Sequence, residues 1–161
     1  MSTTQIQTLA ARGEPVAYAA MRIVAGAMLA FHGVQKIVGW PAGGFMPTVG
    51  SQIWLGGWIE LLGGSLVAFG LFTRVAAFLA SGTMAVAYFQ FHWKLAISDA
   101  LWIPTLNKGE LAALYSFVFL FIAARGGGLV SVDAAILRRR QPREAVMSTG
   151  VRENVQAPAA R

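Results

Sequence analysis

The sequence predicts an all-α integral membrane protein that folds as an antiparallel four-helix bundle. Of its 161 residues, 56% are hydrophobic and only 12% are charged, whereas soluble domains carry about 25% charged residues. The mean hydropathy is +0.57, and long apolar runs alternate with short segments rich in glycine and proline. A helix of about 20 apolar residues crosses a bilayer, and the chain has room for four.

Four apolar runs define the expected spans, at about residues 16–38, 53–72, 75–97 and 109–127. They make up one membrane domain, residues 16–130. Residues 1–15 are polar and are expected to form a flexible cytoplasmic N-terminus. Residues 131–161 are basic and polar, a composition typical of a disordered tail.

The placement of lysine and arginine predicts the orientation of these spans. Arg12, Arg74 and the cluster at 138–143 fall on one side of a four-span chain. Cytoplasmic segments are enriched in these residues, so both termini are expected in the cytoplasm. Seven of the 13 basic residues lie from Arg125 onward, which fits a juxtamembrane tail and not a nucleic-acid surface. The chain has no cysteine, which excludes disulfides and thiolate metal sites.

Glu60 is the residue around which the spans are organised. It is the only acidic residue between Glu14 and Asp99, and glycine pairs at 56–57 and 63–64 flank it. A carboxylate inside a span is costly and usually faces a partner or a water-filled cavity. Small residues on its face let another helix approach closely. An ion pair with Lys36 or His32 is the structural interpretation, and a ligand site is the functional one.

The expected topology brings other polar residues to the same, outer half of the bundle. Glu60 and His32 are candidates for proton transfer. The candidate ligand-binding residues are His92, Tyr88, Lys36, Asn107 and Glu110. Arg22 and Arg74 are expected near the cytoplasmic face as structural charges that pair with backbone carbonyls or lipid phosphates.

Three ligand chemistries fit these residues. A carboxylate–histidine pair can exchange protons with a quinone. A metal such as zinc, copper or iron would use His32, His92, Glu60 and Glu110, and a haem would use the two histidines. The sequence identifies no cofactor; a quinone fits best, and the ligand spacing assigns no metal site.

Several motifs taken together resemble the DoxX family. They are Arg22, His32-Gly33 with Lys36, Glu60 with Gly63-Gly64, Gly70-Leu71 with Thr73-Arg74, Asn107–Ala112, Leu114-Tyr115, and Gly128 with Ser131 and Asp133. The resemblance covers about residues 18–135 and implies a small four-helix protein of the bacterial inner membrane. It also implies a link to redox complexes such as thiosulfate–quinone oxidoreductase, or to enzymes of sulfur metabolism and oxidative stress.

The leading hypothesis is a redox-associated membrane protein with a small-ligand pocket near Glu60 and His32, at most an oxidoreductase or a subunit of one. A non-catalytic scaffold for a redox enzyme is the alternative, and a small carrier is the third choice. The expected partners are the lipid bilayer and a redox enzyme or other membrane subunit. A homo-oligomer is compatible with the sequence, and nucleic acid is not an expected partner.

Overall fold

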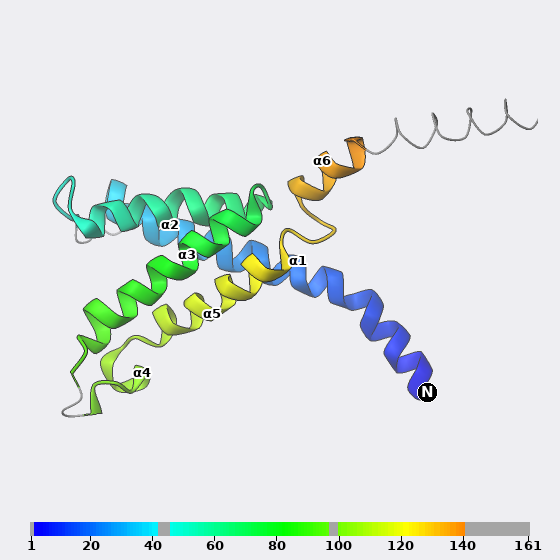
Figure 1. Ribbon diagram of the computed structural model, residues 1–161, viewed down its shortest axis with the longest axis horizontal. Helices are drawn as coiled ribbons and strands as arrows, with labels where there is room; N and C mark the ends of the chain where they lie inside the picture. Colours follow the sequence, from blue (N-terminus) through cyan, green and yellow to red (C-terminus); the bar gives the residue numbers. More distant parts are fainter. Residues whose placement is uncertain (1, 42–45, 97–99, 141–161) are drawn as a thin grey trace, which may run out of the picture.

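The computed structural model describes residues 2–41, 46–96 and 100–140 (Figure 1). The described part is helical throughout, with loops between the helices and no strand. The elements are α1 (Thr3–Val38), α2 (Gln52–Phe69), α3 (Thr73–Ala87), the π-helix η1 (Tyr88–Trp93), α4 (Pro104–Asn107), α5 (Glu110–Arg125) and α6 (Val132–Arg140). The prediction of an all-α fold is confirmed.

Three of the described helical segments are long and apolar enough to cross a membrane. They are Gly13–Val38, Gln52–Phe69 and the continuous segment Thr73–Trp93. The fourth apolar helix, α5, has 16 residues and is shorter than each of the other three. The length and composition of three helices therefore support membrane insertion.

The first helix begins much earlier than the expected span at residue 16. It starts at Thr3 and continues through Pro15, so most of the segment expected to be a flexible N-terminus is helical. Residues 5–12 are mostly good helix formers such as glutamine, leucine and alanine. Proline within a helix favours a kink, and in Figure 1 the N-terminal part of α1 bends away from the rest of the helix.

The expected disordered tail also contains a helix, α6, at its start. Asp133 fixes this helix to the α2–α3 turn, because its amide donates to the carbonyl of Gly70 at 2.9 Å. The rest of the predicted tail, residues 141–161, lies outside the described residues. The sequence did not reveal this helix because the contact that anchors it joins segments about 60 residues apart.

The boundaries of the middle helices follow from local backbone geometry. Ser51 caps α2 by accepting a hydrogen bond from the Trp54 amide at 3.2 Å. Gly70 and Phe72 end α2 before residue 72, since both have positive φ angles, of 72° and 47°. The third span ends at Trp93, where Lys94 takes a φ of 55°; its predicted end at residue 97 lies outside the described residues.

Glycines bring the first two long helices into backbone contact. A Cβ on Gly64 of α2 would lie 2.6 Å from the carbonyl oxygen of Gly26 on α1. A Cβ on Gly57, two turns earlier, would lie 3.0 Å from the Cβ of Lys36. The close approach expected from the small residues around Glu60 is therefore present, and it sets α1 and α2 side by side (Figure 1).

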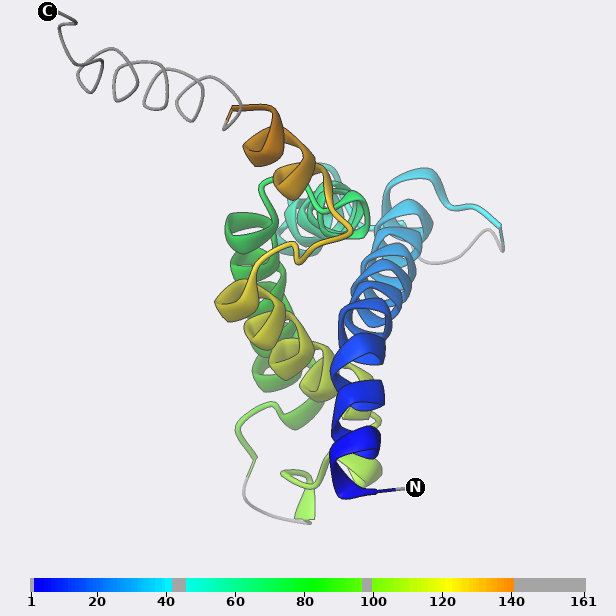
Figure 2. The same ribbon diagram turned by 90° about the vertical axis from the view of Figure 1, so that its right-hand side faces the viewer.

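The remaining helices pack in sequence order. α2 contacts α3, and α3 packs along α5. α1 lies to one side of the α3–α5 pair (Figure 2) and meets α5 through side chains, such as the ion pair of Glu14 with Arg125. The core between the pairs is made of fully buried apolar residues, namely Leu29, Val67, Ala77, Ala80, Phe119 and Ile122. Towards the start of α2, the α3–α5 pair leans away from α2 (Figure 1).

Candidate functional site

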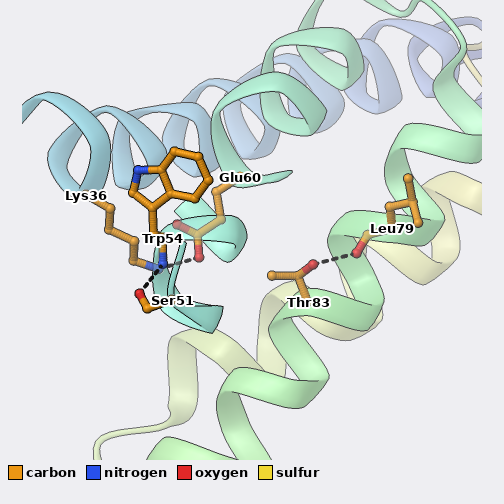
Figure 3. Close-up of polar contacts among 6 residues, drawn as sticks. All are labelled: Lys36, Ser51, Trp54, Glu60, Leu79 and Thr83. Carbon is orange, nitrogen blue, oxygen red and sulfur yellow. Dashed lines mark hydrogen bonds and ion pairs between the residues drawn. The ribbon is translucent and has the colours of Figure 1, made fainter. Parts of the chain in front are cut away.

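An ion pair joins the first two long helices at Glu60. The Nζ of Lys36 lies 2.5 Å from Oε1 of Glu60, and Figure 3 shows the lysine side chain reaching from α1 to the carboxylate on α2. Glu60 is 2% exposed and Lys36 is 31% exposed. The pair therefore spans from the helix interface to the surface, which reduces the cost of burying the carboxylate.

A cavity of about 260 Å³, which we call the polar cavity, lies beside this pair between α1, α2, α3 and α5. Its polar lining residues are His32, Lys36, Glu60, His92, Lys108 and Tyr115. The rings of His32 and Tyr115 meet edge to face, with centroids 6.5 Å apart. We call His32, Lys36, Glu60, His92 and Tyr115 the Glu60 cluster.

Two atoms of the Glu60 cluster are buried without a hydrogen-bond partner among the described residues. They are Oε2 of Glu60 and the hydroxyl of Tyr115. Buried polar atoms in proteins almost always have a partner, and an unpaired one costs about 1–3 kcal/mol. Both residues line the same cavity, so a polar ligand there could satisfy both atoms.

A second and larger cavity adjoins the first. This apolar cleft has a volume of about 590 Å³ and lies between α2 and the α3–η1 segment. Lys36, Glu60 and His92 line both cavities. The rest of the cleft wall is largely apolar and includes Leu55, Phe78, Leu79, Val86 and Phe91. The charged pair therefore lies where a polar space meets an apolar one.

His92 belongs to the π-helix η1, which continues α3. Its Nδ1 lies 3.3 Å from the carbonyl oxygen of Asn107, a contact that positions the ring between the two cavities. Short π-helical segments occur frequently at functional sites. The wider turn changes which side chains of this segment face α2 and α5.

Three of the predicted ligand-binding residues lie outside both cavities. The Tyr88 hydroxyl donates to the carbonyl of Trp102 at 2.7 Å. The Asn107 amide group donates to the carbonyl of Leu101 at 2.7 Å. Glu110 is exposed at the first turn of α5. Tyr88 and Asn107 thus hold the loop that precedes α5.

A separate polar group, which we call the Arg22 cluster, lies at the other end of the long helices and comprises Arg22, Thr73, Arg74 and Asp133. Arg22 is 1% exposed. Its guanidinium donates to the carbonyls of Val67, Ala68 and Val130, the last at 2.7 Å. Arg74 donates to the carbonyls at the end of α5, reaching Ala124 at 2.6 Å.

Asp133, about 60 residues later in the sequence, caps the start of α3. It accepts hydrogen bonds from the Phe72 amide and from the amide and hydroxyl of Thr73, at 2.9, 3.0 and 2.7 Å. Burial raises the pKa of Asp133, but these hydrogen bonds and the positive charge of Arg22 outweigh it and hold the pKa below its ordinary value. The carboxylate is therefore ionised at neutral pH.

Comparison with known proteins agrees with this description. The DoxX family model matches residues 17–93. An uncharacterized protein of Haemophilus influenzae is 38% identical over 128 residues, which cover 78% of this chain and 94% of that protein. The chain belongs to the DoxX family. No solved structure matches it.

The metal hypothesis requires His32, His92, Glu60 and Glu110 to lie together, and the haem hypothesis requires the two histidines. The structure brings the histidines and Glu60 to one cavity, without Glu110. Among the described residues, no three His, Cys, Asp or Glu side chains are grouped to hold a metal ion. Both histidines line the polar cavity, whereas Glu110 does not. The polar groups around the cavity are two lysines, a tyrosine and two imidazoles beside one carboxylate, a set suited to an oxygen-containing organic ligand.

Tyr115 and Lys108 line the polar cavity and were not assigned to the site from the sequence. Tyr115 lies in the middle of an apolar run, where a buried tyrosine hydroxyl requires a partner; that is the signal that could have identified it. The position of Lys108 beside the cavity depends on the path of the loop before α5, which no local pattern specifies.

Proposed function

We propose that this DoxX-family chain is a redox-associated protein of the bacterial inner membrane that binds a quinone-like ligand at the Glu60 cluster. In this proposal the chain spans the membrane as an antiparallel four-helix bundle with both termini in the cytoplasm. The ligand head group occupies the polar cavity. Whether electrons are exchanged depends on a partner redox enzyme, as the sequence resemblance implies.

The unpaired Oε2 of Glu60 is the observation that carries this proposal. It is buried beside a cavity, although the other oxygen of the same carboxylate is paired with Lys36. A hydroxyl group of a quinol would donate to this oxygen. Glu60 can then accept that proton when the quinol is oxidised.

The neighbouring residues supply the complementary donors. Quinone carbonyl oxygens accept hydrogen bonds, and the Tyr115 hydroxyl is a buried donor with no partner among the described residues. His92 and Lys36 border the same space. A quinol would satisfy both unpaired atoms at once, because one of its hydroxyls can donate to Glu60 and the oxygen of the other can accept from Tyr115.

Native mass spectrometry and ligand titration of the purified protein test this proposal. Wild type should bind a quinol in about stoichiometric amount, and Glu60→Gln should weaken quinol binding at least about tenfold because the acceptor for the quinol hydroxyl loses its charge. Glu14→Gln is the matched control, since Glu14 is paired with Arg125 at the far end of α5. Equal binding by Glu60→Gln and wild type would contradict the proposal.

The scaffold alternative has one observation in its favour. α6 extends away from the other helices (Figure 1) and exposes Leu137 and basic Arg138, a surface on which a partner protein could dock. Under this alternative, no quinone binds, Glu60→Gln changes only stability, and removal of α6 releases a co-purifying enzyme. The carrier hypothesis is less favoured, because fully buried apolar side chains such as Phe119 and Ala80 separate the two polar clusters.

A further inference from the structure

We propose that the apolar cleft between α2 and the α3–η1 segment holds the apolar tail of the ligand, which enters the site sideways from the lipid. This inference rests on the proposed function, since it requires a head group at the Glu60 cluster. It adds the ligand class: an amphipathic, membrane-borne molecule with a polar ring and a long hydrocarbon tail.

The size and lining of the cleft fit such a tail. Its volume of about 590 Å³ lies within the range of about 300–1,000 Å³ that is typical of small-molecule sites. Phe78, Leu79 and Val86 contribute exposed apolar side chains to its wall. These residues belong to a segment that can cross the membrane, so the cleft faces acyl chains and not water.

The apolar cleft adjoins the polar cavity, and this arrangement suits a ligand with both a polar and an apolar part. Lys36, Glu60 and His92 line both spaces. A ligand in the polar cavity therefore has an apolar path leading directly away from its head group. Burial of each methylene group in an apolar path is worth about 0.8 kcal/mol, which favours a ligand with a tail over the same head group alone.

Entry from the aqueous end is restricted by a contact across the cleft. The side-chain amide of Gln52, at the start of α2, donates to the side-chain oxygen of Gln90 in η1 at 2.7 Å. Gln52 also lines the cleft. This bond joins the two walls near the loop end. Further along α3, Gly82 has no side chain, and the space beside it in the cleft is unfilled.

A phospholipid acyl chain is the competing occupant. Charge does not separate the two ligands, because Lys36 and Lys108 line the cavity beside Glu60 and would attract a phosphate. The difference is one of depth: a phospholipid head group belongs at the membrane surface and not among buried side chains. A neutral ring with hydroxyl groups can be buried there.

Gly82 provides a way to fill the cleft without disturbing the fold. It lines the cleft, and a Cβ placed there would meet no atom within 4 Å. Gly82→Phe should therefore occupy the space of the tail, and Gly82→Ala is the matched control that changes the backbone propensity alone. Val86→Phe, one turn further along the same wall, repeats the test independently.

The experiment measures the affinity of each variant, in lipid nanodiscs, for dimethoxy-methyl-benzoquinol, kept reduced, with and without a decyl chain. We expect Gly82→Phe to weaken binding of the decyl form at least about tenfold, which is about 1.4 kcal/mol. Binding of the tail-less form should stay within about twofold of wild type. Gly82→Ala should leave both affinities unchanged, and circular dichroism checks that each variant is folded.

Failure of this inference is distinguishable from failure of the proposed function. If Gly82→Phe and Val86→Phe leave the decyl form bound as in wild type, the cleft does not hold the tail, although the head-group site stands. If wild type binds neither quinol, the proposed function is wrong and this inference with it. A phospholipid that remains bound to wild type and is lost from Gly82→Phe, with no preference for the decyl form, would assign the cleft to lipid.

Discussion

The Arg22 cluster and the Glu60 cluster both bury a charge among apolar helices, but they satisfy it differently. The terminal nitrogens of Arg22 donate to three backbone carbonyls from two segments of the chain. Glu60 uses one oxygen for Lys36 and leaves the other without a partner among the described residues. Arg22 is held by the backbone at its terminal nitrogens, although its Nε also has no partner among the described residues; the unpaired oxygen of Glu60 differs in lying beside a cavity that Glu60 lines.

The space around the two charges differs in the same way. A Cβ on Gly70, beside Arg22, would lie 2.5 Å from the Cβ of Ser131 and 2.9 Å from a nitrogen of the guanidinium. These side chains pack closely against the Gly70 backbone, whose φ of 72° also favours glycine. A cavity of about 630 Å³ borders Thr73, Arg74 and Asp133 but not Arg22 itself, whereas Glu60 lines a cavity of about 260 Å³ directly. On this comparison we propose that Arg22 stabilises the fold and that the Glu60 cluster binds a ligand.

The largest expected effect follows from removing the Arg22 side chain. Arg22→Ala should lower the free energy of unfolding by about 3 kcal/mol, because it leaves buried carbonyls unpaired and creates a cavity. Arg22 is the largest fully buried side chain among the described residues. Reversible unfolding in mixed micelles measures the loss, with Met21→Ala, at a more exposed neighbouring residue, as the control. Equal stability of the two variants would show that Arg22 does not stabilise the fold.

A smaller effect is expected where α1 and α2 touch. A Cβ on Gly64 would lie 2.5 Å from the Ala30 amide nitrogen, so Gly64→Ala should force the helices apart. We expect a loss of about 2 kcal/mol from overpacking and weaker ligand binding at the Glu60 cluster, since Lys36 and Glu60 are on the separated helices. Gly82→Ala, which meets open space, should be neutral or slightly stabilising. If both variants behave alike, close contact at Gly64 does not position the ion pair.

The part of the site that could be predicted from the sequence is the part encoded by polar residues in apolar runs. Helical periodicity and span order place His32, Lys36, Glu60 and His92 at one end of the long helices, and the structure brings these four residues to one cavity. The location of a charge in an apolar run is a strong signal because its burial is so costly. The chemistry of that cavity remains a proposal.

The remaining features depend on contacts between distant segments. Asp133 caps α3 across about 60 residues, a contact that no local pattern indicates, although Ser131 caps α6 locally by accepting from the Ala134 amide at 3.1 Å. Tyr88 and Asn107 bond to loop carbonyls, whose positions depend on backbone turns with positive φ angles such as that of Lys108. Periodicity describes which face of a helix is apolar, but it does not describe the path of a loop.

The smallest expected effect tests the Arg22 cluster by pH at Asp133. The pKa of Asp133 is held below its ordinary value by the bonds from Thr73 and Phe72, despite burial. A carboxyl whose pKa is lowered by folding contributes stability at neutral pH that is lost as the pH falls below about 4, through the folded-state pKa. Asp133→Asn should lower stability at neutral pH by about 1 kcal/mol, the usual value of a helix cap.

The variant should differ less from wild type in acid, where the wild-type carboxyl is itself protonated. Unfolding measured for both proteins across this pH range separates the contribution of Asp133 from that of the other acidic residues, because these are common to both chains. Parallel stability curves would show that the cap works as a neutral hydrogen-bond acceptor. Convergence in acid would instead show that the negative charge of Asp133 stabilises the start of α3. The ionised carboxylate of Asp133 would then contribute to the stability of the fold.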